Sequence, residues 1–203
     1  MKHNLPIVLV LLSFLVIPSA SGQNWNFIKE KDGIRIYTRN EPNTSLKSFK
    51  GVMEIRSDMG RVNHLVGNVK NHEWWDPNLL EIKVLYYEQD KRYQYYLIYG
   101  VPWPLWDRDL CVESVVTDDP VTGRRVIFAQ PLKNVIPEKP DLVRIKNYWQ
   151  RWTIEPRENG MIHIVLEGFV DPGGNVPSWL YNMVITDTPL KVMRGVKERV
   201  EIK

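Results

Sequence analysis

The stretch at residues 171–180, DPGGNVPSWL, constrains this chain most, because a polar turn opens directly into an apolar helix. The pair Gly173-Gly174 permits positive φ where the chain must reverse. Asn175 is a candidate helix cap, and Pro177 suits the first helical turn. Trp179-Leu180 would then begin the buried face of the helix. The stretch predicts a long helix laid over the sheet that the preceding residues form.

Most of the remaining chain has the pattern of short strands separated by turns. The candidate strands are residues 34–38, 49–55, 80–86, 93–99, 110–117, 124–130, 142–155 and 161–170. Ser57-Asp58 is a candidate cap for a helix that runs to about Asn68. The final helix should start near Val176, and Pro189 should kink or interrupt it. About eight strands with an early and a long final helix predict an α+β fold with an antiparallel sheet.

Aromatic residues are concentrated on the predicted sheet. The chain has eight Trp and nine Tyr, most of them between Trp74 and Trp179. Alternation puts one set of side chains on a common face of each of two strands: Leu80, Ile82, Val84 and Tyr86, and then Tyr93, Tyr95, Leu97 and Tyr99. Any single ring is most simply a core residue. Together, so many rings are hard to close-pack beneath one helix, and the set indicates a partly wet cavity.

The segment 100–106, GVPWPLW, cannot be an interior strand, because its two prolines lack the ladder donor. It is a loop with an unusually apolar sequence, containing Trp103, Leu105 and Trp106. One interpretation is a loop tucked onto the core. The other is a gate over the mouth of a pocket that can also make transient contact with a membrane.

The first 22 residues have the three-part pattern of a secretory signal peptide. A basic start precedes an apolar run from Pro6 to Ile17 and small residues at Ala20 and Gly22. The apolar run would span about 18 Å as a helix, whereas a bilayer core needs about 30 Å. We therefore expect cleavage before Gln23, a single domain at 23–203, and a periplasmic or secreted protein.

Composition and motifs exclude several functional classes. The formal net charge is only +3 and no run of five like charges occurs, which argues against nucleic-acid binding. Neither a phosphate loop nor a nucleophile elbow is present. His64, His72 and His163 lack metal-ligand spacing and are expected at the surface. The single cysteine, Cys111, is expected to be a buried hydrophobe, and Arg108-Asp109 a salt-bridged strand start.

Several stretches, taken in order, resemble the START family, the lipid-transfer domains related to the steroidogenic acute regulatory protein. The matching stretches are 25–39, 75–78 with 81–85, 102–104 with 108–109, 143–152 and 171–180. Together they extend over nearly all of 25–203. The resemblance implies a helix-grip fold, in which a curved antiparallel sheet surrounds the C-terminal helix. It also implies one lipid or other apolar molecule in an enclosed cavity, gated by the 100–106 loop and the C-terminal helix.

Strand faces and the resemblance together give a set of candidate ligand-binding residues. They are Tyr93, Tyr95, Leu97, Tyr99, Trp103, Leu105, Trp106, Ser114, Trp152, Trp179, Leu180 and Met183. In sterol-binding members an acid and an arginine lie in the cavity, but the corresponding positions here fall near Leu97 and Ser114. Glu113 is adjacent and should point the other way. The resemblance therefore does not extend to a sterol-type polar anchor.

Two other functions remain open at this stage. A polyketide cyclase or aromatase of the same superfamily would handle protons with Tyr95, Tyr99 and Arg144. An interaction module would fill the cavity with its own side chains, leaving no void above about 150 Å³. We favour a monomeric, non-enzymatic carrier with no catalytic residues, metal or cofactor.

Overall fold

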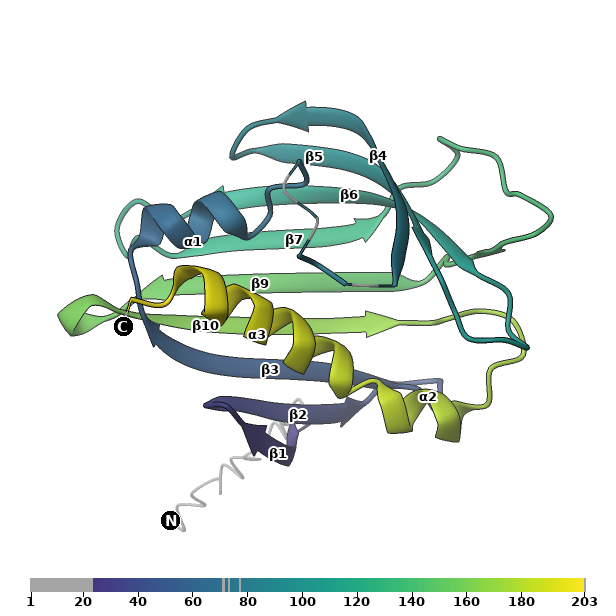
Figure 1. Cartoon of the computed structure of the whole chain (residues 1–203), viewed down its shortest axis with the longest axis horizontal. Coiled ribbons are helices and arrows are strands. Elements are labelled where there is room, and N and C mark those ends of the chain that lie inside the picture. Colours follow the sequence, from purple (N-terminus) through teal and green to yellow (C-terminus); the bar gives the residue numbers. More distant parts are fainter. Residues whose placement is uncertain (1–23, 71, 73, 77, 203) are drawn as a thin grey trace, which may run out of the picture.

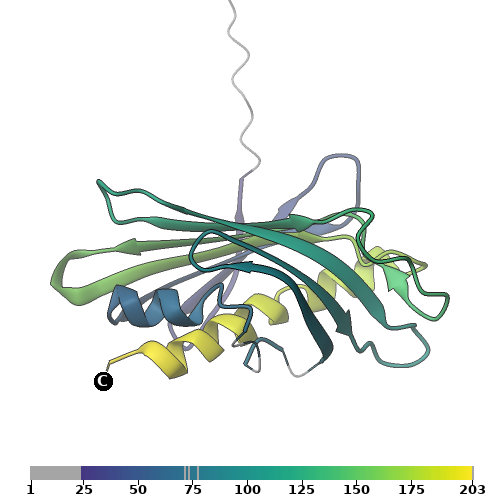
Figure 2. The ribbon, with the colours of Figure 1, turned by 90° about the horizontal axis from the view of Figure 1, so that it is seen from above.

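The computed structural model describes residues 24–70, 72, 74–76 and 78–202. The predicted signal peptide lies outside these residues. A ten-stranded sheet curves around the helices α1 and α3 (Figures 1 and 2). Its strand order is β1-β2-β3-β10-β9-β7-β6-β5-β4, with β8 paired to β6. The α+β helix-grip fold expected from the sequence is confirmed.

The strands are β1 (Asn26–Lys31), β2 (Ile34–Asn40), β3 (Lys47–Arg56), β4 (Leu79–Glu88), β5 (Arg92–Tyr99), β6 (Arg108–Asp118), β7 (Arg125–Pro131), β8 (Val143–Arg144), β9 (Tyr148–Pro156) and β10 (Met161–Val170). The helices are α1 (Met59–Leu65), α2 (Ser178–Val184) and α3 (Asp187–Val200), and a short 3-10 turn occupies Glu158–Gly160. Every strand pair is antiparallel except β6 with β8.

Two strands differ from the sequence prediction. The single strand expected at 142–155 is two, because β8 pairs in parallel with Arg108 and Asp109 at the start of β6. The backbone then leaves the sheet and rejoins it at Tyr148, opposite Val170 of β10. The edge strand β1 was not predicted, because its lysines and glutamate hide the alternation that marks a strand.

The alternation predicted for β4 is correct for Ile82 and Val84 and wrong for Leu80 and Tyr86. Bulges between Leu79 and Glu81 and between Val84 and Tyr86 shift its register against β5. Each extra residue turns the following side chains to the other face of the sheet. Ile82 and Val84 stay on one face, opposite Leu97 and Tyr95, whereas Tyr86 after the second bulge lies opposite Gln94 and is exposed. Bulges of this kind are frequent on edge strands such as β4.

Helix α1 begins where it was predicted to begin but ends earlier. Asp58 caps it, accepting a hydrogen bond from the backbone N of Arg61 at 3.2 Å. The helix ends at Leu65 rather than near Asn68, because Val66 adopts an extended backbone.

The predicted C-terminal helix is two helices. The break lies at residues 185–186, and Pro189 lies in the first turn of α3, where its missing N–H is tolerated. The N-cap position of α2 is Pro177 rather than Asn175, and no side chain caps this helix. Tyr181 and Ile185 are buried, whereas Trp179 is exposed, so the buried face predicted to begin at Trp179 is wrong.

The concave side of the sheet carries two separate hydrophobic clusters. The first packs β2, β3, β9 and β10 against the helices, and Met193 and Val196 of α3 are fully buried in it. Gly51 of β3 permits this close packing, because a Cβ there would lie 2.3 Å from the sulfur of Met193. The second cluster lies over β5, β6 and β7 and contains no helical residue among the described part of the chain. Only the first cluster is closed by helices.

Candidate ligand-binding site

The second cluster contains the tyrosine face predicted for β5. Tyr93, Tyr95 and Leu97 are buried there, and Tyr99 is half-buried beside them. The hydroxyl groups of Tyr95 and Ser114 are 3.2 Å apart, within hydrogen-bond distance. Burial raises the pKa of Tyr95 to about 12, so its phenol stays neutral over the physiological range. The shared face is as predicted.

Two further aromatic residues join this cluster that were not among the predicted site residues. Trp75 lies edge-on to Tyr95, with ring centroids 5.7 Å apart. Tyr148, the first residue of β9, packs on the same cluster and donates from its hydroxyl to the side-chain oxygen of Gln150 at 2.8 Å. Trp75 precedes an Asp-Pro turn signal, and Tyr148 lies where one predicted strand is two. Neither position could be assigned to a face from local pattern.

Tyr99 and Tyr148 combine a deep location with incomplete packing. Burial raises the pKa of both phenols, and each tyrosine lies near Tyr95. Both side chains nevertheless remain only half-buried, so part of each ring adjoins space that water can enter. The cluster is therefore buried at Tyr95 and its neighbours and partly open at Tyr99 and Tyr148, whose rings carry polar tips.

Trp152, another predicted site residue, lies in the helix-covered cluster. It is 8% exposed and stands in register between Ile127 of β7 and Leu166 of β10. It shares the concave face with the tyrosines, but the structure places it in the core beneath the helices rather than beside Tyr95.

The remaining predicted residues form an exposed group on two segments. Trp103 is 92% and Trp106 58% exposed on the loop at 100–107, and Trp179 is 68% and Met183 62% exposed on α2. Leu105 and Leu180 are half-buried. Of the two interpretations of the loop, exposure of both indoles excludes one tucked onto the core. We call these six residues the exposed aromatic patch.

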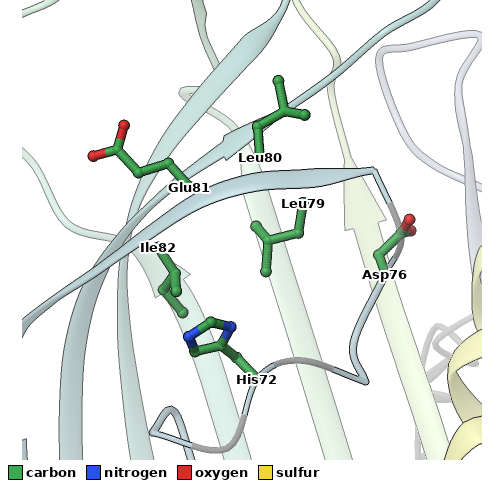
Figure 3. Close-up of a pocket in the computed structure, with 6 residues that line it drawn as sticks. All are labelled: His72, Asp76, Leu79, Leu80, Glu81 and Ile82. Carbon is green, nitrogen blue, oxygen red and sulfur yellow. The ribbon is translucent and has the colours of Figure 1, made fainter.

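Two depressions lie at the molecular surface. One, of about 240 Å³, is lined by His72, Asp76 and residues 79–82 at the β4 edge (Figure 3). His72 lies half-buried in this depression at the molecular surface. The other, of about 460 Å³, lies beside Val143 and the glycines at 173–174. Both are open, and neither is lined by the predicted ligand residues.

A buried ion pair occupies the opposite, convex side of the sheet. Arg144 binds Asp109 with a 2.7 Å Nε–Oδ1 contact, and the hydroxyl of Tyr96 donates to the same carboxylate at 3.0 Å. Burial alone would raise the pKa of Asp109, but these hydrogen bonds lower it. The structure does not bring Arg144 together with Tyr95 and Tyr99. Asp109 has the structural role predicted for it, and Cys111 is buried as expected.

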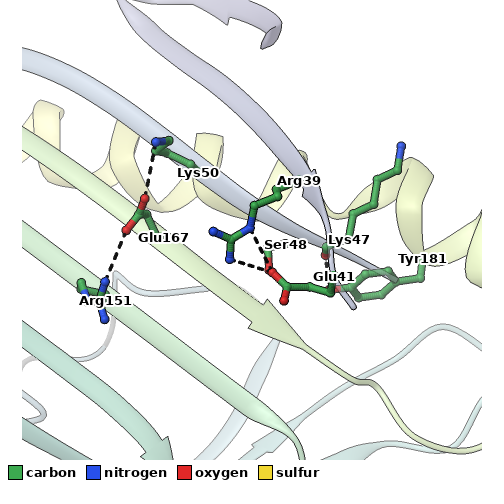
Figure 4. A network of polar contacts seen from close by, with 8 residues as sticks. All are labelled: Arg39, Glu41, Lys47, Ser48, Lys50, Arg151, Glu167 and Tyr181. Carbon is green, nitrogen blue, oxygen red and sulfur yellow. Dashed lines mark hydrogen bonds and ion pairs between the residues drawn. The ribbon is translucent and has the colours of Figure 1, made fainter. Parts of the chain in front are cut away.

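Charged side chains cover much of this convex side. Glu167 of β10 lies between Lys50 of β3, at 3.5 Å, and Arg151 of β9, at 3.9 Å (Figure 4). Glu113 pairs with Arg92 here, facing away from the concave side as predicted. His163 also lies on this side, 3.3 Å from Glu54. These ion pairs make much of the convex side polar.

Two general features of the described residues bear on function. They contain no group of three potential metal ligands. No helix among them is both long and apolar enough to cross a membrane.

Comparisons with known proteins agree with this architecture. The chain matches the START domain over residues 15–202. It is 31% identical to the phosphatidylcholine transfer protein of Rattus norvegicus over 174 residues, which are 81% of this chain and 78% of that protein. It is 27% identical to an uncharacterized protein of Pseudomonas aeruginosa over 96% of this chain and 95% of that one.

Solved structures show the same fold. A STAR-related lipid transfer protein from Xanthomonas axonopodis superimposes with a TM-score of 0.77 at 23% identity, covering 86% of this chain and 97% of that one. Human StAR-related lipid transfer protein 5 gives 0.76 at 17% identity, covering 90% and 88%. By its sequence match over most of its length and by this fold, the chain belongs to the START domain family.

Proposed function

We propose that this protein binds one lipid on the concave side of its sheet and carries it between membranes, with preference for a choline-type headgroup. Family membership and the lipid-transfer relatives support lipid binding in general. The observation that carries the finer proposal is the cluster of Trp75, Tyr95, Tyr99 and Tyr148, in which no residue of a described helix takes part.

This aromatic cluster suits a quaternary ammonium group. Faces of Trp and Tyr rings attract cations, and sets of such rings recognise choline groups in many proteins. The carboxylate of Asp76 is close enough to Tyr99 to contribute, after burial, to its raised pKa. One negative charge near several neutral rings favours a cationic headgroup. The apolar remainder of the cluster, which includes Leu97, Leu110 and Val112, is buried in the ligand-free protein, so acyl chains would contact it only after the segment that bears Trp75 moves aside.

The exposed aromatic patch is proposed as the membrane contact and the entrance. Indole rings are favoured at the boundary between water and lipid. Trp103 and Trp179 come from the two segments that the family resemblance assigns to the gate. Because a lipid must cross this boundary to reach the concave side, exchange should depend on motion of the loop and α2.

Location forms part of the same proposal. The signal-peptide pattern before Gln23 supports export to the periplasm or the medium. A carrier there would move lipids across aqueous space outside the cytoplasm.

A cyclase function has less support. Phenols are good proton donors or acceptors when their pKa lies near the working pH. Burial instead raises the pKa of Tyr95, Tyr99 and Tyr148. Arg144, the third candidate, is paired with Asp109 on the other side of the sheet. We propose a binding protein rather than an enzyme.

The test combines identification of bound lipid with a transfer assay. Protein purified from the host envelope is analysed by native mass spectrometry, and extracted lipids are identified. Transfer is then measured from phosphatidylcholine and phosphatidylglycerol vesicles with identical acyl chains. A stoichiometric lipid and faster phosphatidylcholine transfer are expected. Equal or faster transfer of phosphatidylglycerol would exclude the headgroup preference, and no transfer of either would exclude the carrier.

A matched pair of variants isolates the ring contribution. Tyr148→Leu removes the ring, and Tyr148→Phe keeps the ring while it removes the hydroxyl. Since one cation–π contact contributes about 0.5–2 kcal/mol, the Leu variant should lose several-fold of its preference for phosphatidylcholine. The Phe variant should keep it. Equal loss in both would assign the effect to the hydroxyl bonded to Gln150.

A further inference from the structure

Arg108, the first residue of β6, is a buried arginine on the concave side. It is 4% exposed and stands directly opposite Tyr99 of β5 in the sheet register. Residues opposite each other in an antiparallel pair share a face, so Arg108 points to the same side as the tyrosines. Buried charges are normally paired with an opposite charge, which makes its surroundings informative.

All acceptors of the Arg108 guanidinium are backbone carbonyls. It donates to Trp106, to Pro172 at 3.1 Å and to Gly173 at 3.4 Å. Its guanidinium forms no hydrogen bond to a carboxylate among the described residues. Burial lowers its pKa and the charge of nearby Asp107 acts to raise it, but an arginine stays charged at neutral pH. Its charge is therefore used to hold two chain segments that lie more than sixty residues apart.

The first segment is the loop of the exposed aromatic patch. Its base is closed by a hydrogen bond from the backbone N of Val101 to the Asp107 carboxylate at 2.9 Å. Trp103 projects from the loop into solvent. The loop is thus closed at its base, exposes its indoles to solvent, and is bound by the guanidinium at its carboxyl end.

The second segment leads into α2. Helix α2 is separated from α3 by the break at 185–186, and Tyr181 is its single buried residue. The Asn182 side chain makes two further hydrogen bonds: it accepts one from the backbone N of Lys47 at 3.0 Å and donates one to the carbonyl oxygen of Ser45 at 2.9 Å. Polar contacts rather than extensive burial hold α2 in place. Movement of α2 would therefore have to release Tyr181, its one buried residue, from the first cluster.

We propose that Arg108 is a positioning residue that fastens the Trp-bearing loop to the segment before α2, so that both sides of the entrance open together. Without it, each segment would open independently and more often. The consequence for lipid exchange rests on the proposed function, but the mechanical coupling does not.

Hydrogen–deuterium exchange on residues 23–203 tests the coupling without any lipid. In the wild-type protein, the hydrogen-bonded amides of Val101, Leu105, Gly173 and Tyr181 should exchange through one opening reaction, with the same dependence on low denaturant. In Arg108→Met, exchange of both segments should rise by on the order of tenfold or more, because hydrogen bonds to a charged group are lost. Arg108→Lys should fall between the two.

Arg125 provides the matched control. It is also buried, but it forms ion pairs with Asp90, in the turn before β5, and with Asp118, at the other end of β6. Arg125→Met should lower the free energy of unfolding without loosening the two entrance segments.

The outcomes separate the coupling from the proposed function. Loosening of one segment alone, or of neither, would overturn the role of Arg108, as would different opening reactions for the two segments in the wild-type protein. If Arg108→Met does not fold, the hydrogen–deuterium exchange of the wild-type protein and of Arg108→Lys still tests whether the two segments open together. For a lipid carrier, Arg108→Met should also exchange bound phosphatidylcholine roughly tenfold faster. Absence of lipid binding in the wild-type protein would exclude the carrier function, but it would not affect the conclusion from amide hydrogen–deuterium exchange.

Discussion

Replacing Trp103 by alanine should separate membrane contact from fold stability. The indole is 92% exposed and lies on a loop outside both hydrophobic clusters, so its removal leaves almost no cavity. Surface substitutions of this kind change the free energy of unfolding by no more than about 0.5 kcal/mol. Trp152→Ala is the contrasting change, because Trp152 is buried beneath the helices. Its loss should cost about 3–5 kcal/mol.

The effect on membrane binding should run in the opposite order. Transfer of a large aromatic side chain from water into an apolar environment contributes about 1.5–3 kcal/mol. If Trp103 enters the lipid boundary, Trp103→Ala should weaken vesicle binding roughly tenfold to hundredfold. Partial insertion would give the lower end of this range. Trp106→Ala should have a smaller effect, since that side chain is less exposed before contact.

The assay is flotation with phosphatidylcholine vesicles, run beside urea unfolding and the transfer measurement on the same samples. We expect weaker flotation and slower transfer for Trp103→Ala at unchanged unfolding free energy. A loss of several kcal/mol of stability with normal flotation would refute the reasoning, because the loop would then be core. Unchanged flotation and unchanged stability together would remove the membrane contact from the proposal.

Two further changes test the supporting structure. Gly173→Val should lower the melting temperature by several degrees, because φ is +63° there and the added Cβ would lie 3.0 Å from Val143; unchanged melting would show that the turn tolerates another geometry. Asp109→Asn should destabilise the fold by about 3–5 kcal/mol, since it leaves Arg144 buried without its partner. The folded-state pKa of Asp109 lies below its ordinary value of 3.8, so its stabilisation is present above that pH and is lost as pH falls through the folded-state value. Urea unfolding between pH 6 and pH 2 should show a smaller acid loss in Asp109→Asn than in the wild type.

The local sequence pattern predicts the structure correctly where a single backbone feature, such as regular strand alternation or a positive φ, determines it. Alternation placed Tyr93, Tyr95 and Tyr99 on one face of β5, because the strand is regular throughout its pairing with β6. The glycines at 173–174 were assigned positive φ because few other residues adopt it, and both have it. In these places the sequence and the tertiary structure make the same demand.

Elsewhere the tertiary context decided. The face of each β4 residue depends on bulges formed against β5, which leave no local signature in a run such as 79–88. Trp75 joins the aromatic cluster because the segment after α1 passes over the sheet, and a turn signal does not show where the turn will lie. Tyr148 faces the cluster because β8 diverts the chain to β6 before β9 begins. Each depends on contacts between residues distant in sequence.

The division of the concave side into two clusters suggests how stability and binding coexist in one small domain. The buried apolar residues of all three helices lie in the first cluster, which can close-pack without a ligand. The second cluster contains the tyrosines and Trp75, and no residue of a described helix belongs to it. Its partly open rim, which includes Tyr99 and Tyr148, favours any molecule that removes it from water. If the proposed function is correct, a bound lipid packs against the second cluster, to which no described helix contributes. To reach it, the lipid must pass the entrance formed by the 100–107 loop and α2, whose segments Arg108 joins.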